Sequence, residues 1–208
     1  MKRLILLLLT SLLAVGNVSA QSEAKNSVAA GTANGKDFLL SYYQQTFDTL
    51  QKSVEGLSEA QLQFKPAADR WSISQCLEHI VLTEKMLFDY AKKGLEAPAQ
   101  PERRKDVKKD EDIIKGINDR SFKAKATENL AGKGKYNTAD AALNDLQDER
   151  KPILAYINNV SIQDLRNHIS ESPMGPVDGL QSFLFIAGHT SRHTWQIKEV
   201  KADKNFPK

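Results

Sequence analysis

The chain has 208 residues, with 29 basic and 26 acidic side chains and a formal net charge of +3. A balance so close to neutral leaves no strongly basic surface, so we expect no nucleic-acid partner. Cys76 is the single cysteine, which excludes an internal disulfide. Stability must therefore come from an apolar core, with or without help from a metal.

Residues 1–20 have the composition of a secretory signal. They begin with two basic residues, continue with an apolar run and end in the small residues Val-Ser-Ala. We expect cleavage before Gln21 and export to the periplasm or the medium. The apolar run is too short to favour a retained span, so no stable membrane span is expected after cleavage. Removal of this segment leaves 27 basic and 26 acidic residues, a formal charge of +1.

The first half of the remaining chain predicts two long helices. Residues 21–35 are small and polar and read as a flexible lead-in, so the predicted domain spans 36–208. From Lys36, apolar residues recur three or four positions apart until Gly56, which can end a helix. Ser58 with Gln61 forms a capping box for one short helical turn, and Pro66 stops it. Ser72 with Gln75 forms a second capping box, for a long helix that Gly94 can end.

The second half predicts a long crossover followed by two more helices. Residues 95–137 are irregular, with one helical piece expected over 109–120. Thr138 can cap the third helix, in which Pro152 should cause a kink or a break. Residues 172–179 form a turn region, and Asp178 can cap the fourth helix.

No alternating β-pattern of useful length is visible, and the chain contains no internal repeat. Four long amphipathic helices with one long crossover and otherwise short connections predict an all-α fold. The expected architecture is an antiparallel four-helix bundle with a long crossover.

Two of the four histidines, His189 and His193, stand four positions apart in the fourth helix. They could be metal ligands or a chance polar pair on a solvated face. At 100° per residue they lie about 40° apart, within a stripe that also carries Phe185, Gln196 and Val200. This apolar stripe favours an orientation into the bundle.

A third histidine, His79, shares a stripe of the second helix with apolar residues. The polar side of that helix lies elsewhere, and Glu78, which points about 100° away from His79, is expected to be solvated. His168 lies in a polar connection and is expected at the surface. Three of the four histidines are thus predicted to face the core.

Three core-facing imidazoles favour a shared metal ion. A buried neutral imidazole must satisfy two ring nitrogens, and each unpaired group costs about 1–3 kcal/mol. A divalent cation accepts one nitrogen from each ring while the other N–H binds a neighbouring group. Two imidazoles one helical turn apart with a third from a facing helix make a three-histidine site that leaves room for water or substrate.

Four further side chains near the histidines have alternative interpretations. Cys76 could approach the metal, although a buried, apolar cysteine is commoner. Gln196 could orient a ligand or a water, or be a satisfied core amide. Glu84 is a weak candidate for an acid behind the ligands. Trp71 reads as a packing residue at the start of the second helix.

Two blocks of the sequence resemble the DinB/YfiT-like family. The first is "LSEAQLQFKPAADRWSISQCLEHI", residues 57–80, with its Leu-Ser-x-x-Gln-Leu run, Lys-Pro, Trp-Ser-Ile and a following helical histidine. The second is "GHTSRHTWQI", residues 188–197, with His-x-x-x-His followed by Gln-Ile. The resemblance implies a four-helix bundle with a long crossover that binds divalent zinc or nickel through His79, His189 and His193.

The resemblance leaves the reaction open. Some members of the family are transferases that use mycothiol, bacillithiol or glutathione, one branch isomerises maleylpyruvate, and many have no known reaction. The first hypothesis is a metal-dependent enzyme, of hydrolase or thiol-transferase type, acting on a small molecule. The alternative is a non-catalytic bundle that binds a ligand or partner, with a structural metal or none. A homodimer formed through an exposed bundle face is compatible with either.

Overall fold

The computed structural model describes residues 35–208 except 124. The predicted signal, 1–20, and the predicted lead-in up to residue 34 lie outside the described residues. Within the described part, no helix has both the length and the apolar character needed to cross a membrane.

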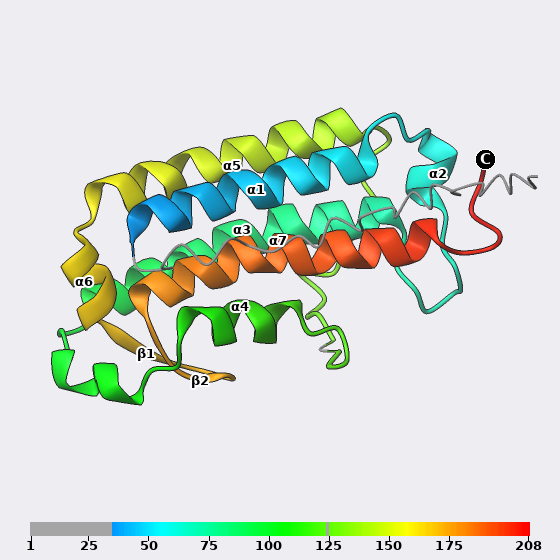
Figure 1. The fold of residues 1–208 in the computed structure, drawn as a ribbon. Coiled ribbons are helices and arrows are strands. Elements are labelled where there is room, and N and C mark those ends of the chain that lie inside the picture. The colour runs from blue at the N-terminus through cyan, green and yellow to red at the C-terminus, as the bar shows by residue number, and fades with distance from the viewer. Residues whose placement is uncertain (1–34, 124) are drawn as a thin grey trace, which may run out of the picture. The chain divides into compact units, whose positions relative to one another are not determined.

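Four long helices form a bundle, as the sequence predicts (Figure 1). They are α1 (Lys36–Val54), α3 (Ile73–Glu96), α5 (Ala139–Asn159) and α7 (Gly179–Lys201). Helix α1 contacts α7 and α5, and α3 contacts the same two helices, so α1 and α3 occupy diagonal positions. The predicted four-helix bundle with a long crossover is confirmed.

The long crossover between α3 and α5 allows these two helices to run in the same direction. In Figure 1, α1 and α7 run one way, whereas α3 and α5 run the other. Contacts between helix ends agree: the Lys36 ammonium donates to the carbonyl of Asn158, and the Lys201 ammonium donates to the carbonyl of Ser53. Antiparallel packing therefore joins α1 to α5 and α3 to α7, while the crossover lets α3 and α5 lie parallel.

The predicted helix starts are present. Ser58 and Gln61 form a capping box in front of α2 (Glu59–Gln63), and Ser72 and Gln75 form another in front of α3. Asp178 accepts from the backbone N–H of the third residue of α7, and Thr138 does the same for α5. These side chains satisfy N–H groups that a helix start leaves without a carbonyl partner.

The connections contain more structure than the sequence predicts. The crossover holds a 3₁₀ helix, η1 (Pro101–Asp106), and α4 (Asp110–Asn118), which covers the predicted helical piece. Between α5 and α7 lie α6 (Ile162–Asn167) and an antiparallel hairpin of β1 (Ile169–Ser172) and β2 (Gly175–Asp178). The hairpin is the one departure from helix among the described elements, and its two four-residue strands are too short to show an alternating pattern in the sequence.

Pro152 does not break α5, which runs without interruption from Ala139 to Asn159. The proline removes one N–H from the helix ladder. Arg150, Ile153 and Ile157 nevertheless remain buried against the other bundle helices. Tertiary contacts on both sides of the proline thus maintain the helix.

The bundle core consists of two apolar clusters with a polar layer between them. The first cluster includes Phe47, Val81, Leu146 and Ile197, and the second includes Tyr43, Phe88, Ile153 and Ala187. Along each helix, one or more buried polar residues separate these apolar positions. The members of this polar layer are Thr46, Thr83, Glu84, Arg150, Thr190 and Thr194.

Candidate metal centre

The three core-facing histidines converge on one point between α3 and α7. One ligand nitrogen from each of His79, His189 and His193 lies within 4.8 Å of the other two. The ring centroid of His79 lies 5.0 Å from that of His189 and 4.6 Å from that of His193. His79 lies near the start of α3, whereas His189 and His193 lie near and beyond the middle of α7. Because the two helices are antiparallel, these positions lie at the same level of the bundle.

Each of two imidazoles uses its Nδ1 to bind an oxygen acceptor. His79 Nδ1 lies 2.7 Å from the carbonyl oxygen of Leu130, which can only accept. His193 Nδ1 lies 2.9 Å from Oε1 of Gln196, an oxygen that also accepts from Arg120. In both rings the proton therefore sits on Nδ1 and the lone pair on Nε2.

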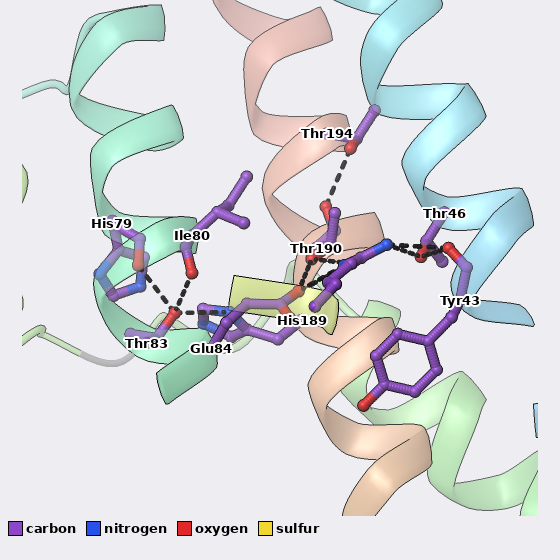
Figure 2. A network of polar contacts seen from close by, with 10 residues as sticks. Tyr43, Thr46, His79, Ile80, Thr83, Glu84, His189, Thr190 and Thr194 are labelled. Carbon is purple, nitrogen blue, oxygen red and sulfur yellow. Dashed lines mark hydrogen bonds and ion pairs between the residues drawn. The ribbon is translucent and has the colours of Figure 1, made fainter. Parts of the chain in front are cut away.

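The third imidazole has a hydroxyl partner. Nδ1 of His189 lies 3.2 Å from Oγ1 of Thr83 (Figure 2). The hydroxyl of Thr83 donates to the backbone carbonyl of His79 at 2.7 Å, so its oxygen is left to accept from His189. All three rings thus donate through Nδ1 and present Nε2 lone pairs.

The Nε2 atoms of His189 and His193 are 3.1 Å apart. Two lone pairs at this separation repel each other unless a proton or a cation lies between them. Two imidazole nitrogens bound to one tetrahedral zinc ion are about 3.3 Å apart, given bonds of about 2.0–2.1 Å. The donor set therefore fits a divalent metal ion.

Burial keeps the imidazoles in the neutral form that binds metals. His79 and His193 are each 7% exposed, whereas His189 is partly exposed. Desolvation lowers the pKa of His79, lowers that of His193 well below its ordinary value and lowers that of His189 to about 3.

Comparisons with known proteins agree with this fold. A family model described as the DinB superfamily matches residues 42–197. The chain belongs to the DinB superfamily. The match includes His79, His189 and His193.

Two proteins of Bacillus subtilis are similar to this DinB-superfamily chain. The uncharacterized protein YuaE of strain 168 is 27% identical over 152 residues, which are 71% of this chain and 88% of YuaE. The structure of YfiT matches with a TM-score of 0.57 at 13% identity, over 83% of this chain and 89% of YfiT. YfiT is described as a probable metal-dependent hydrolase with an unusual four-helix bundle topology. At this identity the likeness shows the fold.

Aromatic rings line the candidate metal centre of this DinB-superfamily protein. The Trp71 ring meets His79 edge to face, with centroids 4.9 Å apart, and stacks near His193 at 6.1 Å. Phe185 stacks near His189 at 6.5 Å. Trp71 is thus a packing residue, as expected, but the groups against which it packs are two of the three imidazoles.

Glu78 corrects one sequence prediction. It is 7% exposed rather than solvated, and its Oε2 accepts from the backbone N–H groups of Lys133, Gly134 and Lys135. The periodicity of α3 shows which face meets the bundle, but the crossover covers a second face. Because the same crossover segment supplies the carbonyl that binds His79, Glu78 helps to fix that carbonyl's place.

The crossover is also held from the α7 side. Arg192 donates to the backbone carbonyls of Ile117, Asp119 and Phe122. The guanidinium of Arg120 donates to both carboxylate oxygens of Glu199 at 2.8 Å. The crossover is therefore held by α7 at Ile117, Asp119 and Phe122 and by α3 at residues 133–135.

Of the other polar side chains considered in the sequence, one binds a histidine ring and three do not. Gln196 binds a histidine ring, so its role in orienting a ligand is the one the geometry favours. Cys76 is fully buried outside the histidine group, and burial raises the pKa of its thiol to about 12. Glu84 forms an ion pair with Arg150 rather than a bond to a histidine. His168 binds a backbone carbonyl in a polar connection, remote from the group.

Sequence reasoning missed the two acceptors of His79 and His189. Thr83 lies one turn after His79 on the same stripe, so its position held a usable signal. Leu130 acts through its carbonyl oxygen within an irregular segment. No side-chain pattern can indicate such an acceptor before the crossover's path is known.

Proposed function

We propose that this protein is a metal-dependent enzyme of the hydrolase type in which His79, His189 and His193 hold one divalent cation. The carrying observation is the arrangement of the three imidazole rings. Each Nδ1 has an oxygen acceptor, so the Nε2 lone pairs converge where two of them are only 3.1 Å apart. Zinc and nickel are the expected metals, since both bind imidazole.

Three protein ligands suit catalysis better than structure alone. A three-histidine cation keeps a coordination position for water or a thiol and lowers the pKa of the group that takes it. The rings of Trp71 and Phe185 pack against the imidazoles and would add apolar surface beside the cation.

Hydrolysis is the first candidate reaction because YfiT, which shares the fold, is described as a probable metal-dependent hydrolase. The alternative of a closed structural site requires a fourth ligand, for which Cys76 was the candidate. Cys76 lies outside the group of side chains whose ligand atoms are close enough together to share one ion. This observation counts against the structural alternative.

Metal analysis of two histidine variants tests the proposal. We expect about one zinc or nickel ion per chain in the wild-type protein, as a single three-histidine site holds one ion. His79→Ala should lose the metal, together with any hydrolysis of generic esters. His168→Ala is the matched control and should keep both. Equal metal content in wild type and His79→Ala would remove His79 from the site.

Export is part of the same proposal. The first twenty residues have the pattern of a cleaved signal, so the working enzyme would act in the periplasm or outside the cell. Mass measurement of the protein from its native host tests this directly. A mature chain that begins at Gln21 supports export, whereas a chain that retains the basic N-terminus contradicts it.

A further inference from the structure

A buried ion pair lies directly behind the histidines. Glu84 on α3 is 1% exposed and Arg150 on α5 is 4% exposed. Oε1 of Glu84 accepts from Nε and Nη2 of Arg150 at 3.0 and 2.7 Å. Nη1 of Arg150 donates to the Tyr43 carbonyl on α1, and Nη2 also donates to the Thr190 hydroxyl on α7. One guanidinium therefore binds groups on the three other bundle helices.

The pair is coupled to the metal centre through adjacent residues. Thr83 on α3 binds His189, and the next residue, Glu84, accepts from the Thr190 hydroxyl at 3.0 Å (Figure 2). Two consecutive residues of one helix thus hold two consecutive residues of the other. Any slide of α7 along α3 that moved His189 would also break the bonds of Thr190.

The apolar parts of the core cannot fix this register as sharply. Dispersion contacts between aliphatic side chains tolerate small slides, whereas hydrogen bonds to a charged group fail when the distance or angle changes. Burying an ion pair also costs desolvation, and replacing such a pair by apolar residues of similar volume is often neutral or stabilising. The pair's contribution to a unique arrangement is therefore separable from its contribution to stability.

We propose that Glu84 and Arg150 are positioning residues that set the register of α7 against α3 and thereby the geometry of the metal site. This inference rests on the proposed function, because it concerns how the cation is held. Neither residue binds the metal. Their ion pair holds Thr190, and through it His189, at the height where the imidazole meets His79 and His193.

The first test replaces the pair by apolar residues. E84L/R150M keeps approximate side-chain volume and leaves no unpaired charge, so the variant is expected to fold. We expect affinity for Zn²⁺, measured with a competing chelator, to fall by about tenfold or more, as for other groups behind metal ligands. The visible absorption bands of the Co²⁺-loaded protein should also change, because these bands report ligand geometry rather than stability.

The second test uses a matched pair of conservative variants in α7. Thr190→Val removes the hydroxyl that contacts Glu84 and Arg150. Thr194→Val removes an equally buried hydroxyl that donates to the backbone carbonyl of Thr190. We expect Thr190→Val to weaken Zn²⁺ binding by roughly threefold to tenfold and to alter the Co²⁺ spectrum, and Thr194→Val to do neither.

The outcomes separate the two proposals. Wild-type protein that binds neither Zn²⁺ nor Co²⁺ overturns the proposed function and this inference together. Wild-type protein that binds both ions, with Thr190→Val and Thr194→Val giving the same affinity and spectrum, overturns the inference alone. The threonine pair gives this answer whether or not E84L/R150M folds.

Discussion

Two buried arginines of this protein make similar ion pairs in different places. Arg150 binds Glu84 at 2.7 Å within the bundle core. Arg166 on α6 binds Asp110 at 2.6 Å and Asp178 at 2.8 Å, near the hairpin. Hydrogen-bond distances do not distinguish the two networks, and their burial differs only slightly. Their other contacts distinguish them.

The Arg150 network joins all four bundle helices beside the histidines. The Arg166 network instead joins the starts of α4 and α7 to α6, because Asp110 begins α4 and Asp178 caps α7. It therefore fixes the elements that connect the helices. The two ion pairs differ in the groups that their partners contact, and we infer that this difference decides their roles. Removal of Arg150 should affect the metal site, whereas removal of Arg166 should not.

The largest effect is expected from Arg150→Met. The change leaves the Glu84 carboxylate buried without its cation, which typically costs about 3–5 kcal/mol of unfolding free energy. Metal affinity should fall as well, because Thr190 loses one of its two partners in the pair. Urea unfolding followed by Zn²⁺ titration at temperatures where the variant is folded measures both. Stability loss with unchanged affinity would make the two networks equivalent.

Arg166→Met should destabilise the protein somewhat less, by about 2–4 kcal/mol, since the Arg166 side chain is 11% exposed and that of Arg150 is 4% exposed. Zn²⁺ affinity and the Co²⁺ spectrum should stay at wild-type values. A change in either would extend the positioning role to the hairpin end and remove the contrast between the networks.

The pH dependence of Arg166→Met follows from Asp178. Burial raises the pKa of this carboxyl above its ordinary value even beside Arg166. Without the guanidinium its folded-state pKa rises further above the unfolded value, so the folded state binds the proton more tightly. The variant's deficit in unfolding free energy should therefore shrink as the pH falls from 7 to 5. A deficit that grows over this range would contradict the assignment.

The sequence predicts the bundle and the three core-facing histidines because both depend on local periodicity. Helical spacing places His189 and His193 on one apolar stripe, and the stripe that contains His79 is visible in the same way. Four capping residues mark the helix starts correctly. These features require no knowledge of how distant segments meet.

What the sequence does not predict depends on the crossover and on helix order. Glu78 reads as solvated because periodicity locates the bundle face of α3, and nothing local shows that residues 130–136 cover another face. The contact between the Leu130 carbonyl and His79 is not predicted for the same reason. Arg150 lies on the buried stripe of α5 between Leu146 and Ile153, but local spacing does not show which groups receive its charge. The diagonal placement of α1 and α3 surrounds it with polar partners.

Glu78→Gln sharpens the comparison, because Glu78 is a buried charge paired with backbone amides. The glutamine keeps one acceptor oxygen but loses the charge that strengthens three bonds, so we expect a loss of about 1–2 kcal/mol. Amide hydrogens of Lys133, Gly134 and Lys135 should exchange faster, while the α7 register should hold. Glu128→Gln, at an exposed position of the same crossover, should change stability by less than about 0.5 kcal/mol. If Glu78→Gln altered the Co²⁺ spectrum as strongly as Arg150→Met, the crossover would position the metal site as much as the ion pair does.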